Sequence, residues 1–317
     1  MQELNVRSIS RAATVPRRNL WREMVRHRAL YILVLPSVVY FLIFKYLPLW
    51  NAQIAFKDFQ PLDGIMGSAW SGFDNFMAFF KSYYFTELIR NTLFYSFAKL
   101  LFGVPTAVLL ALAIFESKRP FFRRLVQTIT YLPHFLSWII MYGLLLMLLS
   151  PGDGLVNDVL KLLGFKPIAF MTTASTFPWV VILSDIWKEM GWSAIIFLAA
   201  LLAIDPSLFE AADMEGANAL QKIKYITLPS ILDVIVVVVL LRLGNILDAG
   251  FHQIFVLYSY PVFSVADIID TWVYRQGLLE FQFALATAVG LFKGVIGMAL
   301  LVTSNRLVRK LSGSSLY

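Results

Sequence analysis

Two charged residues inside an apolar segment are the first candidates for chemistry in this 317-residue sequence. The segment 177–203 contains Asp185 and Lys188, which are three residues apart and would share one face of a helix. Ionisable groups are costly to bury in an apolar environment, so they usually face a polar cavity or pair with each other. The two alternatives at this stage are a hydrophilic path for a solute and an ion pair between Asp185 and Lys188.

A second polar stripe lies in the segment 229–249. Arg242, Asn245 and Asp248 follow one another at intervals of three residues, which again places them along one side of a helix. Two helices that present polar stripes could together border a translocation path. The alternative is that Arg242 pairs with an acid and only fixes helix packing.

Catalytic chemistry finds no support in the sequence. No Gly-Lys dipeptide occurs, so the phosphate-binding loop of an ATPase is missing and any ATP would be hydrolysed by another polypeptide. The serine hydrolase motif G-x-S-x-G and the zinc motif H-E-x-x-H are also missing. The three histidines, His27, His134 and His252, are far apart, and there is no cysteine. We therefore expect no catalytic residue, metal site or cofactor in this chain.

The composition indicates a membrane protein. The sequence is 59% hydrophobic and only 15% charged, whereas soluble domains are nearer 25% charged. Apolar runs of about twenty residues, long enough to cross a bilayer as a helix, recur along it. We predict an all-α polytopic membrane protein with six transmembrane helices. Their approximate limits are 29–49, 91–115, 125–149, 177–203, 229–249 and 283–304.

The distribution of basic residues predicts the orientation. Seven arginines lie in residues 1–28, and further Lys and Arg residues follow the second span, occupy the loop 204–229 and end the chain. The loops on the other side hold only five. Because basic residues mark the cytoplasmic side, both termini and the loop 204–229 are predicted to be cytoplasmic. The predicted organisation is a basic arm (1–28), a transmembrane domain (29–304) and a basic tail (305–317). The net charge of +7 is thus explained by membrane topology, with lipid as the expected partner, and does not indicate a nucleic-acid partner.

The loop 204–229 is the most distinctive polar stretch. Asp205 is placed to cap a short helix that starts at Pro206, since proline at the first position loses no needed N–H. Ala211 and Ala212 keep one face of this helix thin, which would let another protein approach its backbone. Gly216 then permits a turn that a side chain would oppose.

This loop resembles the cytoplasmic EAA loop of permease subunits in binding-protein-dependent ABC importers. The residues that carry the resemblance are Glu210, Ala211, Ala212, Gly216, Leu228 and Pro229. The resemblance implies the fold of type I importer permeases, with a cytoplasmic coupling helix between the fourth and fifth spans. It also implies that this loop docks into a cleft on a cytosolic ATPase subunit, which would bind the ATP and Mg.

Most of the chain from 29 to 310 is similar to sugar-importer permeases of the polysaccharide or complex-oligosaccharide branch. The stretches NTLFYS (91–96), YLPHFLSW (131–138) and WKEMGW (187–192) carry this resemblance, and 248–297 is similar to permeases of alginate-type importers. The implied partners are a second, different permease subunit, two cytosolic ATPase subunits and an extracytoplasmic solute-binding protein that delivers saccharide. The implied location is the inner membrane.

The resemblance further implies that the middle of the fourth and fifth spans borders the sugar path. The residues concerned are Asp185, Lys188, Asn245 and Asp248. Cations such as Lys188 would favour an acidic, alginate-like saccharide, although the two aspartates would repel it. Two alternatives are an ABC permease for a different solute and a secondary transporter driven by an ion gradient, which would leave the EAA loop unexplained.

Overall fold

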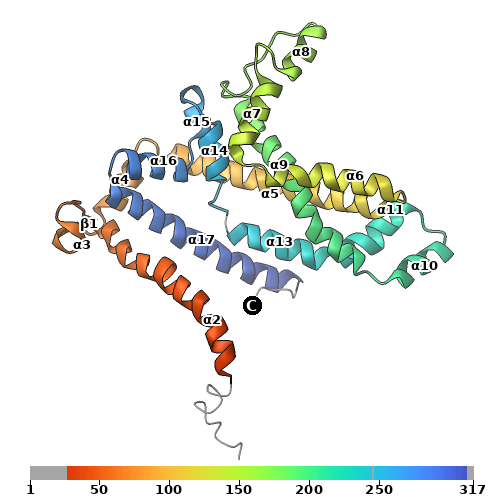
Figure 1. The fold of residues 1–317 in the computed structure, drawn as a ribbon, viewed down its shortest axis with the longest axis horizontal. Helices are drawn as coiled ribbons and strands as arrows, with labels where there is room; N and C mark the ends of the chain where they lie inside the picture. Colours follow the sequence, from red (N-terminus) through yellow and green to blue (C-terminus); the bar gives the residue numbers. More distant parts are fainter. Residues whose placement is uncertain (1–26, 245, 313–317) are drawn as a thin grey trace, which may run out of the picture. The chain divides into compact units, whose positions relative to one another are not determined.

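The computed structural model describes residues 27–244 and 246–312 and shows an almost wholly helical chain (Figure 1). In these residues the only strands are β1 (Lys57–Asp58) and β2 (Ala69–Trp70), which form a short antiparallel pair. The predicted all-α class is confirmed.

The chain divides into two compact units, residues 1–53 and 54–317. The first contains α2 (Arg28–Phe41), which continues through a π-helical turn at Leu42–Tyr46 into a 3₁₀ segment, Leu47–Phe56, that extends into the second unit. No residue of α2 is buried within the chain. A helix that is apolar all round suits lipid or another membrane helix, as predicted for the first span.

Six long helices form the body of the second unit as far as it is described. They are α5 (Phe85–Glu116), α6 (Pro120–Tyr131), α7 (Trp138–Leu149), α9 (Phe177–Leu202), α13 (Leu232–Gly244) and α17 (Phe283–Ser312). Shorter helices precede or connect them. These are α3 (Gly64–Gly67), α4 (Asp74–Lys81), α8 (Leu155–Leu162), α10 (Pro206–Met214), α11 (Ala219–Lys222), α12 (Leu228–Ser230), α14 (Phe251–Leu257), α15 (Phe263–Ala266) and α16 (Ile269–Tyr274).

The membrane-spanning character agrees with the prediction of six spans. Among the described residues, three helical stretches are long and apolar enough to cross a bilayer: 28–56, 85–116 and 283–306. Three bent helix pairs pass the same test together, α6 with α7, α9 with α10, and the helices on either side of Ile231. Counting each pair as one span gives up to six.

The third span differs from the prediction of one helix over 125–149. Its helix starts earlier, at Pro120, and breaks at a 3₁₀ turn, Leu132–Phe135, so that α6 and α7 meet at 113°. Pro133 lies in this turn and cannot donate a backbone hydrogen bond, which ends α6. Ser137 then caps α7 by accepting a hydrogen bond from the Ile140 N–H at 3.3 Å.

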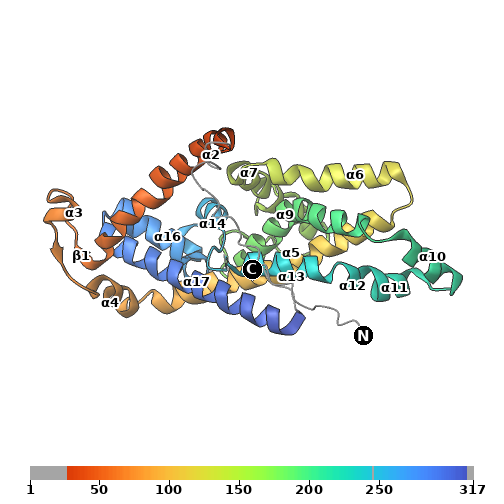
Figure 2. The same ribbon diagram turned by 90° about the horizontal axis from the view of Figure 1, so that it is seen from below.

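Packing is organised around α5 and α9, which contact each other along much of their length. One apolar cluster, including Tyr95 and Phe177, joins them to α14, and a second, including Ala107 and Phe197, joins them to α13. In both views α10 and α11 lie at one end of α5, and α4 and α16 lie at the other (Figures 1 and 2).

Candidate functional site

A cavity of about 430 Å³ lies between α5, α9 and α13. Four ionisable side chains line it: Lys99 from α5, Asp185 from α9, Arg242 from α13 and Asp248 from the turn that follows. The structure therefore brings together Asp185 and Asp248, two of the four residues predicted to border a path. Asn245, the third, lies outside the described residues.

Asp185 pairs with a residue that the sequence reasoning missed. The Lys99 Nζ lies 3.2 Å from Asp185 Oδ1, so the alternative pairing of Asp185 with Lys188 is not found. Lys99 sits within the apolar run of α5, and an ionisable residue in such a run is itself a signal that could have identified it. Its partner could not be inferred, because that depends on how α5 and α9 align.

Lys188, the fourth predicted path residue, does not line this cavity. Its buried ammonium donates to the backbone carbonyl of His134 at 2.5 Å and lies 3.4 Å from the Glu189 carboxylate. The break between α6 and α7 leaves that carbonyl without a helical partner. The position of Lys188 is therefore explained by the need to satisfy a polar backbone group in the broken third span.

Arg242 directs its guanidinium at the cavity with few partners of its own. Its Nη2 donates to Ser193 Oγ at 2.9 Å, and within the described residues no carboxylate lies within ion-pair distance. The hydroxyl of Ser96 also lines the cavity, is buried and has no hydrogen-bond partner in the described part of the chain. Both groups therefore have capacity to bind a polar solute.

An aromatic surface adjoins these polar groups. Trp192 lines the cavity and is 46% exposed. Its ring is stacked on the His134 ring, with 4.5 Å between the centroids, and meets the Phe135 ring edge-on. His134 Nδ1 is in turn 2.8 Å from Glu189 Oε2. This contact fixes the imidazole and thereby the indole. The cavity thus combines a flat apolar face, hydrogen-bonding groups and charges of both signs.

The predicted coupling loop folds as a braced helical segment at the end of α9. Asp205 caps α10 by accepting a hydrogen bond from the Ser207 N–H at 2.9 Å. The hydrogen bond from the Ser207 backbone N–H is the largest cause that lowers the pKa of the Asp205 carboxyl, and a hydrogen bond from the Ser207 side chain adds to it. Pro206 occupies the first turn, as the sequence predicted.

Gly216 ends α10 in the left-handed conformation, with φ +72°. The Ala217 N–H bonds to the Ala212 carbonyl at 2.9 Å and the Gly216 N–H to the Asp213 carbonyl at 3.1 Å. This is the Schellman arrangement that favours glycine, so the predicted turn is confirmed. Asp213 also forms an ion pair with Lys222 of α11.

The next turn is braced as well. Asn218 and Gln221 form a reciprocal capping box at the start of α11, with hydrogen bonds of 2.9 and 2.7 Å. No residue of α10 is buried within the chain. Met214 and Leu220 are 89% and 77% exposed, so this segment offers apolar contacts to another protein.

Glu210 and Ala211 are exposed on α10, Leu228 begins α12, and Pro229 lies in the first turn of that helix. The described residues contain no group of three or more His, Cys, Asp or Glu side chains that could hold a metal ion.

Comparison with known families identifies the chain. Residues 100–313 match the model of the "binding-protein-dependent transport system inner membrane component" family, and this match includes the braced loop and all of the described cavity except Ser96 and Lys99. The chain belongs to this family. It is therefore an inner-membrane permease component of an ABC importer.

Individual relatives cover nearly the whole permease. It is 41% identical over 301 residues to the polygalacturonan/rhamnogalacturonan transport system permease protein YteP of Bacillus subtilis (strain 168), covering 95% of this chain and 94% of the relative. It is 40% identical over 292 residues to protein LplB of the same organism, covering 92% of each. Its fold is similar to a crystal structure of a bacterial ABC transporter involved in the import of the acidic polysaccharide alginate. That match has a TM-score of 0.86 and 41% identity, and covers 92% of this chain and 99% of the other. The predicted fold of a type I importer permease is confirmed.

The first prediction concerns the cap of α10. We expect Asp205→Ala to reduce ATP-driven uptake by the assembled importer, because the first turn of α10 loses its cap, while Asp205→Asn retains activity. A lowered pKa means that the carboxylate stabilises the segment above about pH 4 and ceases to as the pH falls through the lowered value. Uptake by the wild type and by Asp205→Asn should therefore show the same pH dependence between about pH 5 and 8. Equal activity of the Ala and Asn variants would contradict the cap's importance.

The second prediction concerns Gly216. A side chain in the left-handed region costs about 1–2 kcal/mol, so Gly216→Val should distort the end of α10. We expect ATP hydrolysis to continue while uptake falls, with normal amounts of the permease in the membrane. Gly216→Asn is the matched control, because asparagine tolerates this conformation better. Normal uptake by the valine variant at normal expression would refute the prediction.

Proposed function

We propose that this permease passes oligo- or polysaccharides that carry carboxylates from a solute-binding protein to the cytoplasm, driven by ATP hydrolysis on partner subunits. The observation that carries the proposal is the continuity of α9. This 26-residue helix contributes Asp185 and Trp192 to the cavity and leads through Asp205 directly into α10. One rigid element therefore joins the solute-contacting region to the braced loop.

The proposed partners are a second, different permease subunit, two cytosolic ATPase subunits that bind ATP and Mg, and an extracytoplasmic solute-binding protein. A related crystal structure is described as an alginate ABC transporter in complex with an alginate pentasaccharide-bound periplasmic protein, and is 40% identical to this chain. In the proposed topology the arm 1–28, the loop 204–229 and the tail 305–317 are cytoplasmic, flanking the transmembrane domain 29–304.

The coupling surface is proposed to consist of Glu210, Ala211, Ala212 and Gly216, with Leu228 and Pro229 at the start of the returning helix. Small side chains at 211 and 212 permit close approach, and the exposed carboxylate of Glu210 can pair with a basic residue of an ATPase subunit. The bracing of α10 and α11 supports movement of this segment as one body. Closure of the ATPase pair would then move α9 and change access to the cavity.

The sugar path is proposed to include Asp185, Asp248 and Asn245. Because Lys188 supports the broken third span and Lys99 is already paired with Asp185, Arg242 is better placed than either lysine to balance the charge of a solute. The open face of Trp192 can contact the C–H surface of a pyranose ring. The Arg242 guanidinium has no carboxylate partner among the residues that the structure describes. It therefore favours uronate substrates, since it offsets the cost of removing their carboxylates from water.

The experiment that tests this function is ATPase activity of the purified, lipid-reconstituted importer with and without its binding protein and candidate saccharides. We expect hydrolysis to rise when the binding protein is loaded with oligogalacturonate or oligoalginate. Stimulation by a neutral saccharide or by an amino acid instead would indicate a permease for another solute. Uptake that survives ATP depletion but collapses with the ion gradient would indicate a secondary transporter.

A third prediction tests the role of Arg242. Replacing it by Gln removes a charge-assisted contact of about 1.5–3 kcal/mol, so uptake of oligogalacturonate should fall by about 10- to 100-fold. Arg242→Lys should retain part of the activity because the charge is kept. The control is Lys161→Gln, which removes an exposed cation of α8 that contacts the Asp158 carboxylate and the Gly152 carbonyl. Equal uptake by Arg242→Gln and the control would show that Arg242 does not bind the substrate.

A further inference from the structure

A buried polar cluster joins three elements beside the cavity, and we call it the Lys99–Gln253 junction. The Lys99 ammonium on α5 contacts Gln253 Oε1 at 2.5 Å, the Ala249 carbonyl at 2.9 Å and Asp185 Oδ1 at 3.2 Å. An ammonium has three protons, so these three acceptors satisfy it fully. Lys99 thus connects α5 with α9 and with the turn that leads into α14.

Gln253 completes the junction from α14. Its amide Nε2 donates to the Val181 carbonyl at 2.7 Å and to Ser184 Oγ at 2.9 Å, both on α9. The residue is 1% exposed and does not line the cavity. Every polar atom of its side chain therefore binds another helix, and none is available for a solute.

The turn at Gly250 is shaped by the same contact. Gly250 has φ +92°, and a Cβ at this position would collide with the Lys99 ammonium. The backbone N–H of Gly250 is held by the Asp248 carboxylate at 3.3 Å. Glycine is therefore required both for the backbone conformation and for the close approach of Lys99.

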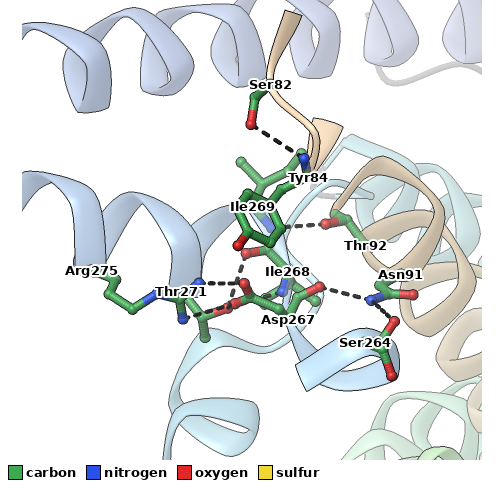
Figure 3. Close-up of polar contacts among 10 residues, drawn as sticks. All are labelled: Ser82, Tyr84, Asn91, Thr92, Ser264, Asp267, Ile268, Ile269, Thr271 and Arg275. Atoms are coloured by element: carbon green, nitrogen blue, oxygen red, sulfur yellow. Dashed lines mark hydrogen bonds and ion pairs between the residues drawn. The ribbon is translucent and has the colours of Figure 1, made fainter. Parts of the chain in front are cut away.

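A second set of contacts anchors the helices beyond this turn to α5 (Figure 3). Asn91 donates to the Asp267 and Ser264 carbonyls at 3.0 and 3.2 Å, and the Ile269 N–H donates to Thr92 Oγ1 at 3.0 Å. The Asp267 carboxylate is held by Arg275 and by the Thr271 hydroxyl. Helices α15 and α16 are thus fixed near the start of α5, away from α10 (Figure 1).

We propose that the Lys99–Gln253 junction makes α5, α9 and the helices α14 to α16 one rigid body, so that movement of α10 at one end reaches α14 to α16 at the other. Lys99 and Gln253 are positioning residues in this account. The inference rests on the proposed function. Helices α14 to α16 precede the last span, which starts on the predicted external side, where the solute-binding protein is proposed to act. Loaded binding protein would act on the ATPase subunits through this body.

Gln253→Leu tests the junction without altering the cavity. We expect the variant importer to keep its basal ATPase activity and its assembly with partner subunits. The stimulation of this activity by oligogalacturonate-loaded binding protein should fall by about tenfold. Lys293→Gln is the matched control. It removes a charge from the half-buried Lys293–Asp270 pair between α17 and α16, outside the junction, and should retain stimulation. Full stimulation of Gln253→Leu would overturn the proposal.

Covalent joining distinguishes a permanent junction from one that opens in each cycle. The chain has no cysteine, so the double variant Ser184→Cys/Gln253→Cys can be linked with a short bifunctional thiol reagent. We expect the unlinked variant to lose stimulation and linking to restore it. Full stimulation of the unlinked variant, or no recovery of stimulation on linking, would overturn the proposal. An unstimulated wild-type importer would instead contradict the proposed function.

Discussion

Broken helices inside a membrane protein leave backbone carbonyls that cannot turn to bulk water, and the rest of this structure depends on how they are satisfied. Lysines on neighbouring helices do this at two places. Lys188 of α9 binds the His134 carbonyl where α6 ends, and Lys99 of α5 binds the Ala249 carbonyl in the turn before α14. The breaks let the chain form a cavity, and the lysines hold the breaks in place.

The same constraint divides the charged residues by role. The ammonium groups of Lys99 and Lys188 donate their hydrogen bonds to backbone and side-chain acceptors of this chain. Each lysine is therefore primarily a structural cation. Within the described residues, Arg242 donates to one side-chain hydroxyl, that of Ser193, and it lines the cavity. Residues that looked equivalent as charges in apolar segments are thus separated by their partners into those that build the site and those available to a solute.

The fold was largely predictable, because its signals are local. The helix α9 begins and ends almost where the predicted apolar run 177–203 does, the Asp205-Pro206 pair starts the next helix, and Gly216 has the positive φ that its turn requires. Pro133 is visible in the sequence, but membrane helices often tolerate a proline. The third span was therefore predicted as one helix over 125–149, whereas the structure breaks it at this residue. The two pairs that brace the loop are both short-range. Asn218 and Gln221 form a capping box, which follows a known sequence rule, whereas the Asp213–Lys222 ion pair follows none.

The candidate site was predictable only in part, because it depends on contacts between distant segments. Asp185 and Asp248, which were predicted to border a sugar path, line one cavity, but the partner of Asp185 lies 86 positions away on α5. No local pattern fixes which faces of α5 and α9 meet. Trp192 likewise gains its orientation from His134, which belongs to another span.

The most direct test of the central claim is site-specific cross-linking from the coupling segment. A single Ala211→Cys substitution in this cysteine-free chain can carry a photoreactive thiol reagent in the membrane-embedded importer. The account predicts a cross-link to an ATP-hydrolysing subunit, whose yield changes when a non-hydrolysable ATP analogue is added. A cross-link only to lipid or to the other permease, unaffected by nucleotide, would contradict it.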